Sequence, residues 1–76
     1  MNYDFTIVIE PDDVGYHAFV PALPGCHSHG ATLDEAQKNI AEAAELHIEA
    51  MIADGDEIPI EHTPFFVSRL SVPVAV

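Results

Sequence analysis

Apolar and polar residues alternate over the first ten positions, a pattern typical of a strand with one buried face. We expect a strand over residues 3–10, with its odd-numbered side chains toward the core. The inward-facing residues are Tyr3, Phe5, Ile7 and Ile9. Residues 11–15 include a proline, two aspartates and a glycine, which interrupt the alternation. This composition favours a hairpin turn and a returning strand over residues 16–21.

A bend follows the second strand, because Pro21 and Pro24 lack the amide protons that a continuous ladder needs. We expect a short third strand over residues 26–29. Gly30 then lets the chain turn into the next element.

One long amphipathic helix is predicted over residues 33–53. Thr32 and Glu35 have the spacing of a capping box, in which the Thr32 hydroxyl accepts a hydrogen bond from the Glu35 amide. At helical periodicity the apolar residues fall on one stripe, which consists of Leu33, Ala36, Ile40, Ala44, Ile48 and Met51, with Ala43 on its flank. Acidic residues gather on the opposite side. Gly55 marks the end of the helix, and Pro59 prevents it from resuming.

The last predicted strand covers residues 65–71 and is apolar on both faces. Only Ser68 interrupts an apolar row of even-numbered positions, which consists of Phe66, Leu70, Val72, Val74 and Val76. One helix cannot cover this much apolar surface, so we expect the segment to lie in an interface between copies of the chain. The expected interface residues are Phe65, Phe66, Val67, Leu70 and Val72.

These elements predict a single α+β domain over residues 1–76 with the order βββαβ. An up-down-up ribbon followed by a helix and a strand closes only when the helix crosses one face of the sheet. A right-handed crossover then places the fourth strand beside the first and parallel to it. We therefore expect a four-stranded mixed sheet in the order 3-2-1-4, with the helix on one face.

The formal net charge is -11, and Lys38 and Arg69 are the only fixed cations. Two cations cannot form a basic patch, so the composition argues against binding to nucleic-acid phosphates. A basic protein is the natural partner. The candidate contact residues are Asp12 and Asp13 in the hairpin turn, and Glu42, Glu45 and Glu49 along the helix. A solvated, self-repelling surface explains the same residues equally well.

Cys26 is the single cysteine, which excludes an internal disulfide and a multi-cysteine zinc site. We expect it to be a small buried apolar residue and not a nucleophile, because no cation is predicted beside it. The first residues contain neither a basic region nor a long apolar stretch. We therefore expect no signal peptide, no membrane span and a cytoplasmic location.

Four motifs follow one another along the chain: Gly15-Tyr16-x-Ala18, Pro21-x-Leu23-Pro24-Gly25-Cys26-x-Ser28-x-Gly30-x-Thr32, Glu35-Ala36-x-x-Asn39 and Glu42-Ala43. Together they resemble the HicB-like antitoxin family. The resemblance implies a truncated RNase H-like fold that lacks nuclease activity. It also implies the antitoxin of a toxin–antitoxin pair, which binds a small basic ribonuclease toxin of the HicA type and blocks its active site. Members of the family commonly form dimers or tetramers.

Many members of that family carry a C-terminal DNA-binding module, and this sequence ends at Val76 without one. We therefore expect no nucleic-acid binding by this chain alone. RNase H-like enzymes hold two magnesium ions with carboxylates on neighbouring strands. The inward positions of the first predicted strand are apolar instead, so we expect no enzyme activity and no cofactor.

His27 and His29 are two residues apart, so both imidazoles point to one side of an extended strand. This spacing is compatible with zinc, nickel or copper. A metal site would need a third ligand, supplied by His17, His47 or His62. Histidines that flank a surface bend are common without any metal, and we expect none here.

The sequence thus favours a non-catalytic antitoxin that acts stoichiometrically. One alternative stays open, which is a non-catalytic oligomeric scaffold or small-ligand-binding domain of the same fold with no toxin partner. A neighbouring gene for a small basic protein would separate the two hypotheses.

Overall fold

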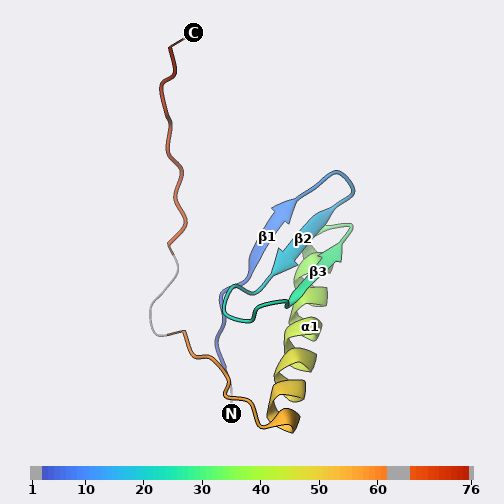
Figure 1. Cartoon of the computed structure of the whole chain (residues 1–76). Helices are drawn as coiled ribbons and strands as arrows, with labels where there is room; N and C mark the ends of the chain where they lie inside the picture. Colours follow the sequence, from blue (N-terminus) through green and yellow to red (C-terminus); the bar gives the residue numbers. More distant parts are fainter. Residues whose placement is uncertain (1–2, 62–65, 76) are drawn as a thin grey trace.

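Three strands and one long helix follow one another in the order β1, β2, β3, α1 (Figure 1). This computed structural model describes residues 3–61 and 66–75. Its elements are β1 (Val8–Pro11), β2 (Tyr16–Phe19), β3 (His27–Gly30) and α1 (Leu33–Asp54). The strands form an antiparallel sheet in the order β1-β2-β3, and α1 packs across one of its faces. The predicted α+β class is therefore confirmed.

β1 and β2 are shorter than predicted, because their ladder ends where β2 meets the proline bend. Val8 pairs with Phe19 at the last position of the ladder. The next amide, on Val20, donates to the carbonyl of Cys26 at 3.1 Å. Pro21 has no amide proton to offer. The first strand therefore begins only at Val8, and the second ends at Phe19.

The core lies between α1 and the sheet. Its buried side chains are Ala18, Val20, Leu23, Cys26, Ala36 and Ile40. Other apolar residues pack against this cluster while partly exposed, namely Phe5, Ile7, Ile9, Ala43, Ala44, Ile48 and Met51. Phe5, Ile7 and Ile9 of the first predicted strand and the apolar stripe of the helix therefore face the core as expected, but Tyr3 is 38% exposed and lies outside this cluster. Leu33 is an exception, because 51% of its surface stays exposed at the first turn of α1.

Both ends of α1 carry the caps that the sequence predicts. The Thr32 hydroxyl accepts from the Glu35 amide at 3.1 Å. Gly55 has a φ of 76°, and its amide donates to the Ile52 carbonyl at 3.1 Å. The helix thus ends one residue later than expected. No helix in the described ranges combines the length and the apolar character needed to cross a membrane.

β3 and the first turn of α1 approach each other closely at Gly30. A Cβ atom on Gly30 would meet the backbone of Ala36, lying 2.7 Å from its Cα and closer still to its nitrogen. Backbone atoms cannot move aside as a flexible side chain does. Gly30 is therefore needed for this packing, beyond its role in letting the chain turn.

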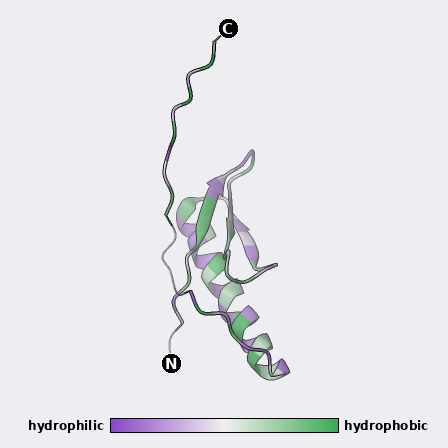
Figure 2. Cartoon of the chain, turned by 60° about the vertical axis from the view of Figure 1, so that its left-hand side comes forward, coloured by the Kyte–Doolittle hydropathy of each residue, from purple (hydrophilic) through white to green (hydrophobic). Residues whose placement is uncertain are grey.

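The prediction of a fourth strand is wrong for the residues that the structure describes. Residues 66–71 belong to no strand, and Phe65 lies outside the described residues. The segment from residue 66 to residue 75, called the tail below, runs away from the body (Figures 1 and 2). The sheet is thus antiparallel throughout and not a mixed sheet of order 3-2-1-4. The crossover argument failed because it assumed that the last strand must close on its own sheet.

The RNase H-like fold that the resemblance implies stays a prediction. The described residues supply its first three strands and its helix but not the fourth strand. No solved structure matches this chain, so no comparison of that kind settles its fold.

A short connector, residues 56–61, leads from α1 back along the N-terminal residues. The Glu61 carboxylate accepts from the Thr6 amide at 2.8 Å and from the Thr6 hydroxyl at 2.9 Å. These bonds serve a part of the chain that has no ladder partner on β2. They also hold the end of the connector beside the residues that lead into β1 (Figure 1).

Candidate functional site

Three exposed glutamates lie along α1: Glu42, Glu45 and Glu49. Their spacing of three and four residues places them in one row, called the acidic ridge below. In the described part of the chain the one ion pair joins His29 to Asp12. No glutamate of the ridge therefore takes part in an ion pair among the described residues. The carboxylates repel one another, and a basic partner would relieve this repulsion.

The two aspartates of the hairpin turn have different surroundings. Asp12 accepts from the Val14 amide at 3.0 Å and lies 3.1 Å from His29 Nε2. The hydrogen bond from Val14, and then the contact with His29, lower the pKa of Asp12. Asp13 is exposed at the tip of the same turn. Asp12 therefore organises the turn, while Asp13 points its charge toward solvent.

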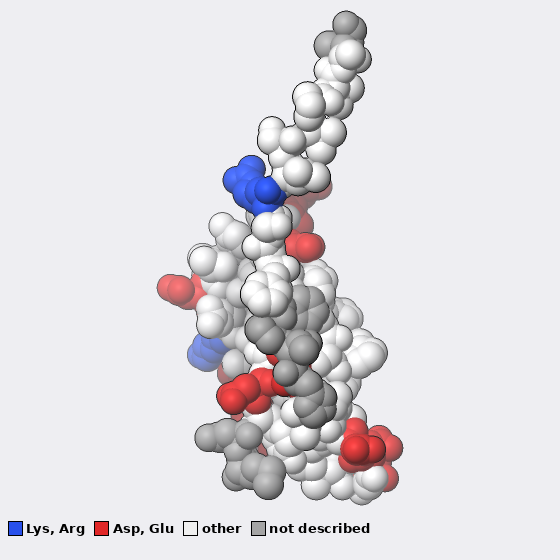
Figure 3. Space-filling model, turned by 90° about the vertical axis from the view of Figure 1, so that its left-hand side faces the viewer, with Lys and Arg blue, Asp and Glu red and all other residues white. Residues whose placement is uncertain are grey.

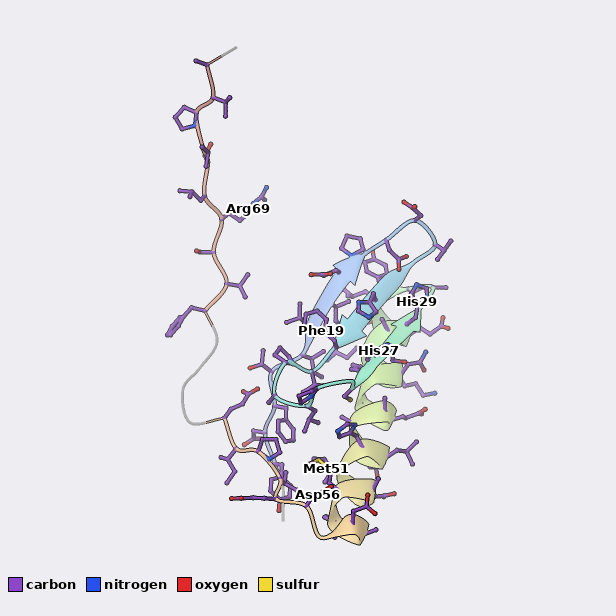
Figure 4. The ribbon with its side chains drawn as sticks, in the orientation of Figure 1. Phe19, His27, His29, Met51, Asp56 and Arg69 are labelled. Atoms are coloured by element: carbon purple, nitrogen blue, oxygen red, sulfur yellow. The ribbon has the colours of Figure 1, made fainter. Side chains whose placement is uncertain are left out.

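The sheet face opposite α1, called the open face below, brings together rings that sequence spacing alone does not connect. His17 pairs with His29 across the ladder, and Phe19 pairs with His27. The His17 ring centroid lies 5.8 Å from that of Phe19 and 5.7 Å from that of His27. Figure 4 shows Phe19, His27 and His29 on these neighbouring strands. His27 and His29 were expected on one side of their strand. The pairing of β2 with β3 places His17 and Phe19 beside them on the same face.

A hollow of about 380 Å³ lies between the open face and the proline bend. His17, Phe19 and His27 contribute to its wall on the strand side, and both prolines of the bend line it as well. Cys26 also lines it but is only 4% exposed, and burial raises the pKa of its thiol. Cys26 is therefore the small buried apolar residue that we expected, and its thiol stays protonated at neutral pH.

The described histidines, at positions 17, 27, 29 and 47, are not gathered into a metal centre. No group of three histidine, cysteine or carboxylate side chains within residues 3–61 and 66–75 is arranged to hold a metal ion. His29 instead contacts Asp12. His62, one of the candidate third ligands, lies outside the described residues.

The interior offers no acid or base for catalysis in the part of the chain that is described. Its buried residues include no polar or charged side chain. The positions that an RNase H-like nuclease would fill with carboxylates hold Phe5, Ile7 and Ile9, which pack against the core.

Four of the five residues expected at an oligomer interface are described by the structure, and all four are exposed in the single chain. The exposed fractions are 88% for Phe66, 84% for Val67, 86% for Leu70 and 65% for Val72. A second apolar surface that the sequence analysis missed is a groove of about 280 Å³ between the N-terminal residues and α1. Tyr3 and Phe5 line one of its walls, and Ala44 and Ile48 line the other, with Glu45 and Glu49 at the helix side.

Comparison with known proteins identifies the family. Residues 5–68 match the family model described as "HicB_like antitoxin of bacterial toxin-antitoxin system". The chain is 52% identical over 73 residues to the UPF0150 protein ssr1765 of Synechocystis sp., an alignment that covers 95% of this chain and 90% of the relative. It is 43% identical over 60 residues to a UPF0150 protein of Archaeoglobus fulgidus, covering 75% and 87% of the two chains.

A phage protein is similar over part of its length. It is an uncharacterized 14.9 kDa protein from the rep-hol intergenic region of Haemophilus phage HP1. The two are 47% identical over 55 residues, which covers 72% of this chain but only 41% of the phage protein. The motifs from Gly15 to Ala43 lie within the region matched by the family model. This chain belongs to the HicB-like antitoxin family.

Proposed function

We propose that the protein is the antitoxin of a toxin–antitoxin pair and neutralises a small basic ribonuclease toxin of the HicA type by covering its active site. The observation that carries this proposal is membership of the antitoxin family, joined to thirteen acidic residues against two fixed cations. Inhibition by covering a site needs no chemistry from the inhibitor. It needs a stable surface of opposite charge to the toxin. The toxin's action on messenger RNA would place the pair in the cytoplasm.

The acidic ridge is the first candidate for the surface that meets the toxin. Its three carboxylates stand on a rigid helix whose ends are capped, so their spacing is fixed before binding. Pre-arranged charges steer a basic partner toward its site and cost less side-chain ordering on binding. Asp13 at the hairpin turn is a second candidate contact. Asp12 is a weaker one, because its carboxylate already has partners within the chain.

Co-purification with the product of a neighbouring gene tests the proposal. The full-length protein carries the purification tag, and the gene pair is expressed together. We expect a small basic protein to co-purify, and its RNA cleavage to fall to zero as the antitoxin reaches a stoichiometric ratio. Retention of full cleavage at an excess of antitoxin would overturn the proposal.

The alternative is a scaffold or small-ligand-binding domain without a toxin. The hollow beside the open face is the observation that favours it, because a volume of about 380 Å³ lined by aromatic, imidazole and proline rings suits a small molecule. A thermal shift with metabolite pools, in the absence of any co-purifying basic protein, would favour this alternative. If a basic partner co-purifies and the hollow still binds a small molecule in its presence, the antitoxin role stays intact.

A further inference from the structure

Three imidazoles lie on the open face and have no part in the proposed function. His17 is on β2, and His27 and His29 are on β3. The ladder places His17 opposite His29, and the ring of His17 also lies close to that of His27, with the centroids 5.7 Å apart. The expectation that no metal binds here came from spacing along one strand. That spacing does not show that His17 lies beside His27.

His29 is already engaged by another side chain. Its Nε2 lies 3.3 Å and 3.1 Å from the two carboxylate oxygens of Asp12. Figure 4 shows His29 nearer to the hairpin turn than His27. Within residues 3–61 and 66–75 no three possible ligands are arranged around one point. The imidazoles that remain for a shared ligand are therefore those of His17 and His27.

The separation of these two rings suits a single metal ion between them. Zinc binds an imidazole nitrogen at about 2.0–2.1 Å, so the ring centroid lies about 3.2 Å from the ion. Two such rings have centroids about 5.2 Å apart at a tetrahedral angle and about 6.4 Å apart on opposite sides of the ion. The observed 5.7 Å falls between these values. Rotation about χ2 of a histidine is soft, so each ring can turn a nitrogen toward the ion.

The surroundings of the pair hold one ring and leave room for further ligands. Phe19 stacks on His17, with centroids 5.8 Å apart and an angle of 26° between the rings. Both imidazoles line the hollow of about 380 Å³ beside the proline bend. Zinc takes four ligands, so two positions would open into the hollow for water or a further ligand. Cys26 is not one of the pair, because its side chain is 4% exposed and belongs to the core.

The charge around the pair favours a cation. Glu10 is opposite His17 on the β1–β2 ladder, so its carboxylate stands on the same side of the sheet. The fixed cations, Lys38 and Arg69, lie on α1 and in the tail and not on the strands of the open face. Acidic side chains are spread over the face of the body that Figure 3 shows, and the formal net charge is -11. The field of the protein therefore attracts cations.

We propose that His17 and His27 bind one divalent transition-metal ion of the zinc, nickel and copper class at the wall of the hollow. Imidazole suits these ions, whereas magnesium and calcium prefer oxygen ligands. The ion would join β2 to β3 next to the proline bend. Because the register of the folded chain brings the two imidazoles together, the ion would also stabilise the fold. The proposal does not depend on a toxin, since it rests on the two imidazoles and their surroundings.

Calorimetric titration of the full chain with Zn²⁺ at neutral pH, without a histidine tag, is the first test. We expect one ion per chain and a dissociation constant between about 1 and 200 μM, because the pair supplies half the ligands of a four-ligand site. His17→Gln and His27→Gln should each raise this constant at least about tenfold. His29→Gln is the matched control from the same face and should keep the parent value. A parent that binds no zinc, or equal weakening in all three variants, would overturn the proposal.

Nuclear magnetic resonance of the imidazole nitrogens tests the assignment without any substitution. In the ¹⁵N-labelled parent chain, Zn²⁺ should shift the ring nitrogens of His17 and His27 and leave those of His29 and His47 in place. Millimolar Mg²⁺ should not reverse these shifts, because it binds oxygen and not imidazole. Shifts at other histidines only, or displacement of zinc by Mg²⁺, would mean that zinc associates with the acidic surface at large. Either result would overturn the proposal.

Discussion

His29 Nε2 lies 3.1 Å from Asp12 Oδ2, and this contact ties β3 to the turn that joins β1 and β2. The two side chains are 43% and 39% exposed, so solvent screens their attraction. The stronger influence on Asp12 is the Val14 amide, and together with His29 it lowers the pKa of the carboxyl. The turn therefore depends on an ionised Asp12.

Acidification should weaken the fold partly through Asp12. Its pKa is lower in the folded chain than in the unfolded chain, so the unfolded chain binds more protons below the ordinary value of 3.8. The contribution to the free energy of unfolding is complete above that value and disappears as the pH falls through the folded pKa. Urea unfolding at a series of acidic pH values should show a shallower pH dependence for Asp12→Asn than for the parent. Identical slopes for the parent and for Asp12→Asn would contradict the prediction.

A side chain at Gly30 should disrupt the packing of β3 against α1. The added Cβ of Gly30→Ala would overlap the Ala36 backbone, so the helix must shift, and we expect a loss of about 2–3 kcal/mol of unfolding free energy. Gly55→Ala is a useful comparison, because nothing lies within 4 Å of its Cβ position and only its φ of 76° is unfavourable. That variant should lose only about 1 kcal/mol. Chemical denaturation measures both, and an equal loss in the two variants would exclude the steric explanation.

Leu23 should contribute as much stability as a residue within a regular element, although it lies in the proline bend. Its side chain is 1% exposed and belongs to the core cluster. Leu23→Ala should therefore cost about 2–4 kcal/mol through lost burial and the cavity left behind. Leu46→Ala removes the same atoms from a side chain that is 66% exposed, and it should change stability by less than about 0.5 kcal/mol. Similar losses in both variants would show that the bend does not hold Leu23 in the core.

Local signals in the sequence predicted the parts of the fold that depend on near neighbours. Thr32 and Gly55 mark the ends of α1 through hydrogen bonds within a few residues, and both caps are formed. The alternation of the first strand correctly identified its inward face. Its length was overestimated because pairing depends on the partner strand, which stops at Phe19 before the proline bend.

The features that were missed depend on how separate strands meet. His17 joins His27 and His29 on the open face only through the β2–β3 register, which spacing along the chain does not encode. The groove beside Phe5 depends on the side to which α1 packs. The fourth strand was predicted from its apolar pattern, but that pattern indicates only that the segment is buried against some surface. The pattern does not identify the molecule that supplies this surface.

Neutralising the acidic ridge should affect the free antitoxin and its complex in opposite directions. Glu45 lies three residues after Glu42 and four before Glu49, so the triple variant Glu42→Gln/Glu45→Gln/Glu49→Gln removes both repulsions and should stabilise the free protein by about 0.5 kcal/mol at low salt. The same change should raise the dissociation constant of the toxin complex at least about tenfold, because the basic toxin loses three opposing charges. The triple variant Asp54→Asn/Asp56→Asn/Glu57→Gln removes three charges beyond the ridge and serves as the control. Thermal melts and calorimetric titration measure the two effects, and equal weakening by both variants would assign the binding to net charge and not to the ridge.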